Sequence, residues 1–272
     1  MLFSLPVLIG LGARWSALAE VSALRTTAES LKLQNESYRA MTAELTGQVA
    51  SVQTAISELS EKAVLDPDSA RALAKLPAGV RSRAMGGGST NTPIARSVLS
   101  STFASPEDTF GTLREVLARL TSGLERAQGD LDRRAELIGA TPSIWPARGA
   151  LSATFGMRED PFGGGSEIHT GIDISAERGE PVYSTADGTV ESAGWNGDYG
   201  NMVVINHKFG LVTRYAHLSS FSIRPGERVE RGQVIGQIGA TGRATGPHLH
   251  YEIVVNGQLT NPLTLLNGSR RP

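Results

Sequence analysis

The stretch Thr245-Gly-Pro-His-Leu-His-Tyr-Glu-Ile253 places two histidines, His248 and His250, inside an apolar and β-branched run. On an extended strand, residues two apart point to the same face and lie about 6.5 to 7 Å from each other. The run is therefore predicted to be a strand with both imidazoles on one face, where either or both could bind a metal. Glu252 would share that face, either as a partner of His250 or as an ordinary strand residue, and we favour the second interpretation.

The residues after Thr141-Pro142 share this β character. Short β-branched segments alternate with Gly, Asn and Asp, and Asp187-Gly188 and Asn256-Gly257 are pairs typical of tight turns. The expected strands are 189–193, 202–205, 211–217, 233–238 and 250–255. The pattern predicts an all-β, mostly antiparallel domain over residues 141–272.

Composition restricts the ligands that a metal could find in this chain. The 272 residues carry a formal net charge of -1 and include no cysteine. The charge gives no indication of a nucleic acid or an anionic membrane surface as partner. Without cysteine, only histidine and carboxylates remain as strong ligands for a transition metal. The five histidines are His169, His207, His217, His248 and His250.

A second candidate pair is His169 and Asp173, in His169-Thr-Gly-Ile-Asp173. A straight strand would hold their Cα atoms roughly 13 Å apart, too far to share a metal easily, so Gly171 is expected to let the chain bend between them. His207 lies in Ile205-Asn-His-Lys-Phe-Gly210, which we interpret as a surface turn.

The amino-terminal half has helical periodicity instead. Apolar and a few polar residues recur at alternating spacings of three and four, which is a heptad pattern. The seam consists of Val21, Leu24, Ala28, Leu31, Asn35, Tyr38, Thr42, Leu45, Val49, Val52, Ile56, Leu59 and Ala63. The pattern predicts a coiled-coil helix over residues 20–64, roughly 65 Å long at about 1.5 Å per residue. Residues 65–105, which include the tract Gly86-Gly-Gly-Ser-Thr-Asn-Thr-Pro93, are expected to be a flexible linker.

A second amphipathic helix is predicted over residues 106–140. Ser105-Pro-Glu-Asp108 supplies a capping serine, a proline at the first helical position and two acids that favour a helix start. Two such helices are expected to pack as an antiparallel hairpin, with homodimerisation as the competing way to cover the seams. The fold class is thus α+β and multidomain, with a helical coiled-coil hairpin before the β domain. No residue of these helices indicates chemistry, so a spacer or a docking surface for an envelope protein is expected.

Residues 1–19 contain an apolar run that is shorter than the roughly 20 residues of a membrane-spanning helix. The run resembles the apolar part of a signal peptide, and Ala17-Leu-Ala19 resembles a cleavage site, although Arg14 follows the run and no basic residue precedes it. The segment is interpreted as a signal peptide or a truncated membrane anchor, with the first turns of the following helix as the alternative. Export to the periplasm or the outer side of the membrane is expected.

Several segments of the β domain resemble the M23 zinc metallopeptidases of the LytM and lysostaphin type, which cut peptidoglycan cross-bridges. The resemblance covers residues 142–266. Its segments are Phe155-Gly-Met-Arg-Glu-Asp-Pro161, His169-Thr-Gly-Ile-Asp-Ile174, Gly179-Glu-Pro-Val182, Tyr199-Gly-Asn-Met-Val-Val-Ile205, Arg214-Tyr-Ala-His-Leu218, Val229-Glu-Arg-Gly-Gln-Val-Ile-Gly236 and Thr241-Gly-Arg-Ala-Thr-Gly-Pro-His-Leu-His250.

The resemblance implies that His169, Asp173 and His250 bind zinc and that His217 and His248 are catalytic. Two neutral imidazoles and one carboxylate leave zinc with a net positive charge and an open position for a water of lowered pKa. The substrate implied is the peptide stem of peptidoglycan. The stretch Pro161-Phe-Gly-Gly-Gly-Ser-Glu-Ile168 lacks the Tyr that glycylglycine-cutting relatives carry before the first zinc ligand, which favours D,D-type cross-links.

Two other classes of protein are compatible with parts of the pattern. A non-catalytic LytM-like regulator would bind and activate other cell-wall hydrolases through its coiled coil, but this chain keeps every site residue. A carrier domain with a swinging arm is suggested by Val229-Glu-Arg-Gly-Gln-Val-Ile-Gly-Gln-Ile238, but no lysine lies in an exposed turn that could hold the prosthetic group.

Overall fold

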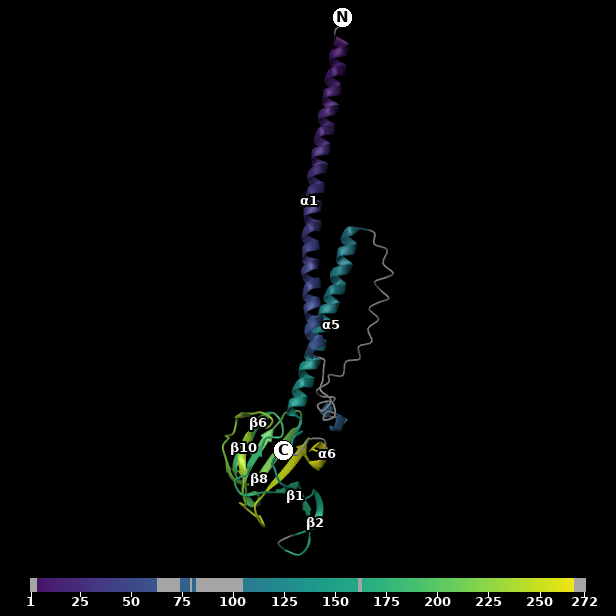
Figure 1. The fold of residues 1–272 in the computed structure, drawn as a ribbon. Coiled ribbons are helices and arrows are strands. Elements are labelled where there is room, and N and C mark those ends of the chain that lie inside the picture. The colour runs from purple at the N-terminus through teal and green to yellow at the C-terminus, as the bar shows by residue number, and fades with distance from the viewer. Residues whose placement is uncertain (1–3, 63–73, 79, 82–104, 161–162, 267–272) are drawn as a thin grey trace. The chain divides into compact units, whose positions relative to one another are not determined.

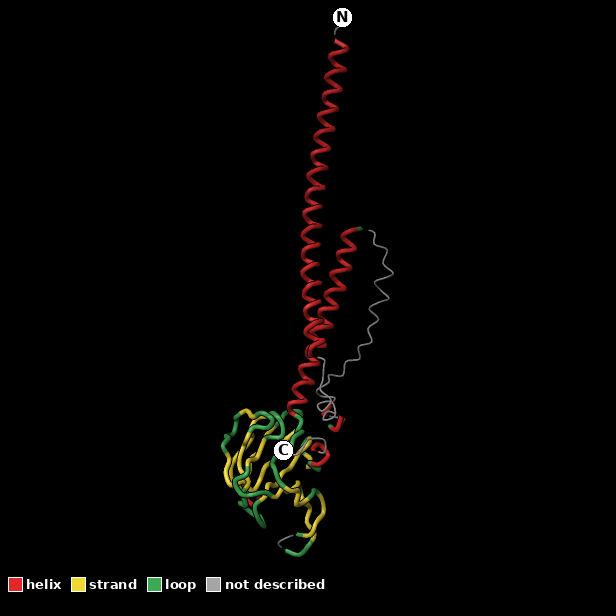
Figure 2. The backbone as a smooth tube through the Cα atoms, viewed as in Figure 1, coloured by secondary structure: helices red, strands yellow, loops and turns green. Residues whose placement is uncertain are grey.

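The computed structural model describes residues 4–62, 74–78, 80–81, 105–160 and 163–266 (Figure 1). The chain divides into two compact units. One unit comprises Met1–Ser60 and Asn91–Arg126, and the other comprises Glu61–Thr90 and Ala127–Pro272. The first unit is helical and the second contains all the strands (Figure 2).

The helical unit contains most of one long helix and the first part of another. Helix α1 covers Ser4–Lys62 and helix α5 covers Pro106–Ala140. The start of α5 is capped as its sequence predicts, because the Ser105 hydroxyl accepts a hydrogen bond from the backbone N–H of Asp108 at 3.1 Å. None of the described helices combines the length and the apolarity that a membrane crossing needs.

The two helices run parallel where they meet, so the predicted antiparallel hairpin is wrong. Tyr38 stacks on Phe110 with ring centroids 6.0 Å apart, and Glu44 forms an ion pair of 2.6 Å with Arg114. Residue numbers therefore increase in the same direction along both helices. Residues 63–105 connect the helices, and a connection of that length, at about 3.3 Å per residue, can span either helix and does not force a reversal.

The second unit is built on one large antiparallel sheet. Its main path has the order β1-β4-β11-β8-β7-β6-β9, while β10 pairs with β5 and β8 and β12 pairs with β11. The strands are β1 (Ala150–Ala153), β4 (Ile172–Ser175), β5 (Pro181–Tyr183), β6 (Gly188–Trp195), β7 (Asn201–Asn206), β8 (Leu211–Phe221), β9 (Arg228–Val229), β10 (Val234–Ile238), β11 (His248–Val255) and β12 (Gln258–Thr260). The five strands expected from the sequence correspond to β6, β7, β8, β10 and β11.

A separate two-stranded ribbon projects beside this sheet. It consists of β2 (Gly156–Glu159) and β3 (Ser166–His169), which pair antiparallel with Arg158 opposite Glu167. A short 3-10 helix, η1 (Gly197–Tyr199), precedes β7, and helix α6 (Leu263–Leu266) follows β12. The ribbon brings His169, at the end of β3, to the edge of β4.

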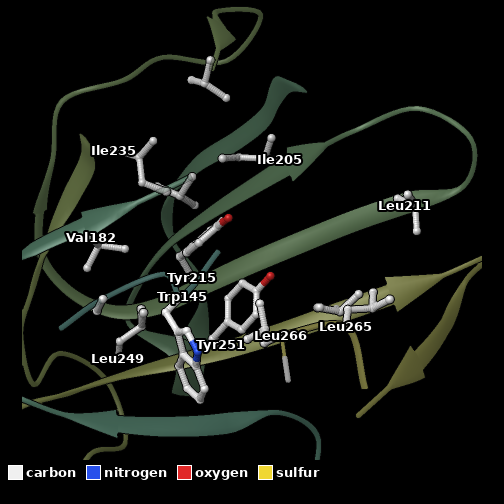
Figure 3. Packing of buried hydrophobic residues seen from close by; sticks show 14 of the residues in the cluster. Trp145, Val182, Ile205, Leu211, Tyr215, Ile235, Leu249, Tyr251, Leu265 and Leu266 are labelled. Atoms are coloured by element: carbon white, nitrogen blue, oxygen red, sulfur yellow. The ribbon is translucent and has the colours of Figure 1, made fainter. Parts of the chain in front are cut away.

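The main core packs against the sheet (Figure 3), and it includes residues from outside the β domain. Tyr215 and Tyr251, on neighbouring strands, pack with ring centroids 5.2 Å apart. Leu137 of α5 belongs to the same cluster. So do Leu76 and Val80, from the segment expected to be a flexible linker, most of which lies outside the described residues. Leu76 and Val80 are packed because the free energy gained by burying their apolar side chains exceeds the conformational entropy lost when the chain around them is ordered.

Candidate metal centre and catalytic cleft

Strand β11 carries core residues on one face and candidate site residues on the other. Leu249, Tyr251 and Ile253 belong to the apolar core, whereas His248 and His250 alternate with them and line a cleft. The register places His250 opposite Asp173 of β4 on one side and opposite Ala216 of β8 on the other. The prediction of a strand with His248 and His250 on one face is therefore confirmed.

A bend between β3 and β4 brings His169 and Asp173 together. The two strands belong to different sheets, and Thr170-Gly171 joins them. A Cβ at Gly171 would lie 2.3 Å from the backbone oxygen of Tyr251 and 3.0 Å from Cε1 of His250, so only glycine fits this close approach. The bend expected at Gly171 is confirmed.

Three potential ligand atoms converge at the centre of the cleft. His169 Nε2 lies 3.1 Å from Asp173 Oδ1 and 3.0 Å from His250 Nδ1, and His250 Nδ1 lies 2.8 Å from Asp173 Oδ1. Ligand atoms placed tetrahedrally about 2.0 to 2.1 Å from a zinc ion are about 3.3 Å apart. The observed triangle is close to that size, so these residues fit a zinc ion after movements of a few tenths of an ångström.

Each of the two imidazoles at this triangle is held by its other nitrogen. His169 Nδ1 lies 2.8 Å from the backbone oxygen of Thr154, and His250 Nε2 lies 3.1 Å from Glu252 Oε1. Without a cation, the nitrogens at the triangle can donate to Asp173. With a cation there, the outer nitrogens would carry the protons, because a carbonyl or a carboxylate only accepts hydrogen bonds. The lone pairs of His169 Nε2 and His250 Nδ1 are then free to bind a cation.

Glu252 is a partner of His250, so the interpretation of it as an ordinary strand residue is wrong. Its side chain is fully buried and accepts hydrogen bonds from Tyr199 at 3.0 Å and from Arg214 at 3.0 Å. Thr170 donates a further bond to the same carboxylate. Burial opposes the charged form, but the hydrogen bonds from His250, Thr170 and Arg214 lower the pKa of Glu252 to about 2. A permanent carboxylate therefore orients the imidazole of His250.

His217 and His248 form a second pair beside the triangle, with ring centroids 4.7 Å apart. His217 Nδ1 lies 2.8 Å from the backbone oxygen of Thr241, and His248 Nδ1 lies 2.8 Å from that of Gly246. Both histidines therefore carry a proton on Nδ1, because a backbone carbonyl only accepts hydrogen bonds. His248 Nε2 lies 3.9 Å from Asp173 Oδ1, which places it next to the candidate metal ligands.

The backbone of His217 is in a conformation that is rare for a residue with a side chain. Its φ is 60°, and the pairing of β8 with β7 and β10 shifts register around this point. Such bulges re-aim a side chain at the expense of local backbone strain. Here the irregularity turns His217 into the cleft, where its ring centroid lies 5.9 Å from that of His250.

The electrostatics keep the carboxylate of Asp173 charged and His217 neutral. Burial acts to raise the pKa of Asp173, but the hydrogen bonds with His169 and His250 outweigh it and hold that pKa far below its ordinary value. Burial lowers the pKa of His217 to about 4, and the neighbouring His248 and His250 act in the same direction. At neutral pH, His217 is therefore a neutral base able to accept a proton.

These groups lie in a cleft of about 440 Å³. One wall is the β2–β3 ribbon, with Arg158 and Glu167, and another is the loop before β11, with Arg243 and Pro247. Arg243 bridges the two walls through an ion pair of 2.8 Å with Asp160. A cleft of this size accommodates a peptide segment and not a whole folded protein domain.

The fifth histidine, His207, lies away from the cleft, but its interpretation as part of a surface turn is wrong. It is 1% exposed, and its two nitrogens lie 2.7 Å from the Asp187 backbone oxygen and 2.7 Å from Thr213 Oγ1. Burial lowers its pKa to about 4. His207 is therefore a buried, hydrogen-bonded residue of the fold and does not line the cleft.

A buried set of His, Asp and His donors, with two further imidazoles beside it in an open cleft, defines the class of site found in metal-dependent hydrolases. Residues 167–262 match the profile of Peptidase family M23. The matched residues include the whole candidate site, so this part of the chain is similar to the M23 peptidases.

Curated relatives match less than half of the chain. The DD-carboxypeptidase/endopeptidase Mpg of Neisseria meningitidis is 50% identical over 115 residues, which cover 42% of this chain and 26% of that protein. The peptidoglycan DD-endopeptidase ShyC of Vibrio cholerae is 44% identical over 116 residues, covering 42% of this chain and 27% of that protein. The chain thus spans about a quarter of the length of these relatives.

Among solved structures, the catalytic domain of the antimicrobial peptidase lysostaphin from Staphylococcus simulans is 30% identical. The match covers 44% of this chain and 92% of that chain, with a TM-score of 0.41.

Proposed function

We propose that this chain is a zinc-dependent endopeptidase that hydrolyses peptide cross-links of bacterial peptidoglycan, with a preference for D,D-type bonds. The observation that carries the proposal is the triangle of His169 Nε2, Asp173 Oδ1 and His250 Nδ1, whose edges measure 2.8 to 3.1 Å. The names of the two curated relatives, a DD-carboxypeptidase/endopeptidase and a peptidoglycan DD-endopeptidase, support the choice of substrate.

The ligand roles follow from the donor atoms. His169, Asp173 and His250 would hold the ion, which would supply a Lewis acid and a bound water of lowered pKa. Arg158 and Glu252 would hold Asp173 and His250 in place, since each contacts the part of its partner that faces away from the triangle. His250 would thereby keep a single tautomer throughout the reaction, and His169 would do so through the backbone oxygen of Thr154.

His217 and His248 would act on protons and on developing charge. Each has its Nδ1 proton fixed on a backbone carbonyl, so Nε2 is the atom that exchanges a proton or donates to an oxyanion. Because His217 is neutral at physiological pH, it can accept a proton without first losing one. Mutation of each histidine in turn is needed to decide which of the two accepts the first proton.

Digestion of purified sacculi by the full chain tests the proposal. Cross-linked muropeptides should be converted to monomers, as measured by mass analysis of the released products. Chelation should abolish the activity and added zinc should restore it. Chelation-resistant cleavage, or a zinc-loaded chain that leaves cross-links intact, contradicts the proposal, and the second result would favour a regulator that binds other hydrolases.

Two alanine variants separate ligands from catalytic groups. His250→Ala should lose both zinc and activity, whereas His217→Ala should keep near-stoichiometric zinc and lose at least about a hundredfold in rate. Metal analysis of both purified variants decides between the roles. Loss of zinc from His217→Ala would show that this residue is a ligand.

The proposed substrate lies outside the cytoplasm, so the proposal implies export to the cell envelope. The apolar run in residues 1–19 is the candidate export signal or anchor. A fusion of residues 1–40 to a reporter that is active only outside the cytoplasm should give signal. A silent fusion would contradict export by this segment.

A further inference from the structure

The helical unit lacks a buried core of its own. Among the described side chains of residues 14–61 and 105–126, none is buried. Of the fifteen large hydrophobic side chains that are exposed among the residues described, ten lie on α1 and α5. They are Trp15, Leu18, Val21, Leu24, Leu31, Leu33, Val49, Ile56, Leu113 and Leu120. Because helical stability in proteins comes mostly from packing of an apolar face, a further surface is needed to cover these residues.

The contact between α1 and α5 uses only half of each apolar seam. On α1, the half-buried side chains form two rows that repeat every seven residues, Tyr38, Leu45, Val52 and Leu59 beside Met41, Gln48 and Ala55. On α5, a half-buried row repeats at Phe110, Leu117 and Leu124. The other halves remain open. Val49 is 42% exposed and Ile56 52%, while Leu113 is 46% exposed and Leu120 40%. The helix pair therefore presents a second apolar stripe to the outside.

The part of α1 that precedes this contact is open on all sides among the described residues. Tyr38 meets Phe110 and Glu107 near the start of α5, and every residue of 14–37 is exposed. This stretch nevertheless continues the heptad seam, with Val21, Leu24 and Leu31. A seam this regular, over more than two heptads, is typical of a helix that pairs with another helix.

The residue types on the seam favour one kind of partner. One set of seam positions, a, is β-branched or small with a single Asn, and the other set, d, is mostly Leu. Set a is Val21, Ala28, Asn35, Thr42, Val49 and Ile56, and set d is Leu24, Leu31, Tyr38, Leu45, Val52 and Leu59. β-Branched residues at a with Leu at d favour parallel two-stranded coiled coils, and a polar Asn at one a position specifies their register.

The charges beside the seam favour the same arrangement. The e positions of the first heptads are all basic, and the g positions are all uncharged. Within residues 21–35, the e residues are Arg25 and Lys32, and the g residues are Thr27 and Gln34. Parallel copies bring e against g, so no like charges meet, whereas antiparallel copies bring e against e and place basic residues together. The chain is thus complementary to a second parallel copy of itself.

We propose that two copies of this chain associate through α1 in parallel and in register. Residues 21–35 form a two-stranded coiled coil, and beyond Tyr38 the open stripes of the two α1–α5 pairs pack on each other. This association is independent of the proposed hydrolysis, because none of the candidate site residues lies on these helices.

The absence of cysteine from the sequence allows a direct test on the full chain. Leu31→Cys places one thiol at a d position, where the two copies of a parallel, in-register pair meet. Leu33→Cys is the matched control, two residues away at a position that faces outward. Leu31 is 59% exposed and Leu33 68%, so neither substitution removes a core side chain of the single chain.

Under mild oxidation, Leu31→Cys should form a disulfide-linked dimer at least about tenfold faster than Leu33→Cys, because the paired helices raise the effective thiol concentration. Light scattering of the unaltered chain should give the mass of two copies. The double variant Leu24→Glu with Leu31→Glu should be monomeric, with its zinc content unchanged.

Three results would overturn the proposal. A monomeric mass for the unaltered chain at micromolar concentration excludes self-association. Equal cross-linking at positions 31 and 33 excludes a seam at Leu31. A dimeric mass without cross-linking at position 31 excludes the parallel register, because identical positions of antiparallel helices lie far apart.

Discussion

Arg158 Nη1 lies 3.1 Å from Asp173 Oδ2, on the opposite side of that carboxylate from the oxygen that faces His169 and His250. Arg158 is itself fixed by an ion pair of 2.7 Å between its Nε and Glu167 on the neighbouring strand. The β2–β3 ribbon thus does more than form a wall of the cleft. It holds one oxygen of the carboxylate and leaves the other for a metal.

Replacing Arg158 should therefore weaken the metal centre without unfolding the domain. Arg158→Gln is expected to lower zinc affinity or the hydrolysis rate by about 10- to 100-fold, as is usual when a partner of a metal ligand is lost. Arg158→Lys keeps the charge without the planar fork and should recover part of the loss. Competition with a chromophoric chelator measures the affinity, and Arg178→Gln, at an exposed arginine, is the control. Zinc affinity and rate within about twofold of the unaltered chain would refute this role.

Glu252→Gln tests the corresponding support of His250. The amide keeps the shape of the side chain but removes the charge that Arg214 and His250 share. Zinc affinity should fall by about 10- to 100-fold, with the larger share in the dissociation rate. Stopped-flow release of zinc to a chelator measures that rate. The conservative variant Arg214→Lys should show a smaller effect of the same sign. An unchanged release rate in Glu252→Gln would contradict the orienting role of Glu252.

The placement of the candidate site could be predicted from the sequence where it depends on local periodicity. The spacing of two residues between His248 and His250 is sufficient to place them on one face of β11. Gly171 indicates the bend that brings His169 to Asp173. The resemblance to a known family supplied the roles, which geometry alone would have left open between ligand and base.

The supports of the site could not be predicted because they depend on pairing between distant strands. Glu252 meets Arg214 through the register of β11 with β8, and Arg158 meets Glu167 through the register of the ribbon. No local pattern encodes either register. The only signal in the sequence was that Glu252 shares a face with His250, and the fully buried position of the carboxylate makes that signal decisive.

The direction of α5 and the burial of His207 were missed for a similar reason. Heptads specify which face of a helix is apolar but not the direction of its neighbour, and a long connection leaves both directions open. His207 fits against Gly188, where a Cβ would lie 2.7 Å from the imidazole. The pair Asp187-Gly188 was predicted to be a tight turn, but Gly188 begins β6 and makes room for His207.

His207 should make the stability of the β domain depend on pH. Its folded pKa of about 4 lies below the ordinary value of 6.5, so the unfolded chain binds more protons between these values. The stabilising effect of the neutral imidazole is therefore fully present above about pH 6.5 and is lost as the pH falls toward 4, up to about 3 kcal/mol in all.

His207→Gln cannot titrate, so the free energy of unfolding of this variant should change less over the same range. Urea unfolding of chelator-treated protein at several pH values between about 7 and 4.5 measures the difference. His217 also titrates in this window but is common to both proteins and cancels. Parallel stability curves for the two proteins would mean that His207 is not the source of the dependence.

The end of α5 should prove to be part of the catalytic unit, although the β domain was expected to begin at residue 141. Leu137 is fully buried in the core, and Asp187 donates its backbone N–H to the Gly139 oxygen at 2.9 Å. The guanidinium of Arg231 donates to the same oxygen at 3.1 Å. A chain that begins at residue 141 loses the apolar side chain and leaves both donors without that acceptor.

Two truncated chains, 127–272 and 141–272, test this contribution. Both chains lack Leu76 and Val80, so those two residues do not contribute to any difference between them. Loss of a buried leucine alone costs about 3 to 5 kcal/mol, so the shorter chain should melt roughly 10 °C or more below the longer one. Both should still bind zinc, because all the candidate ligands follow residue 168. Calorimetry with and without zinc measures the difference. Equal melting temperatures would show that α5 ends outside the cooperative unit and that Leu137 packs without stabilising it.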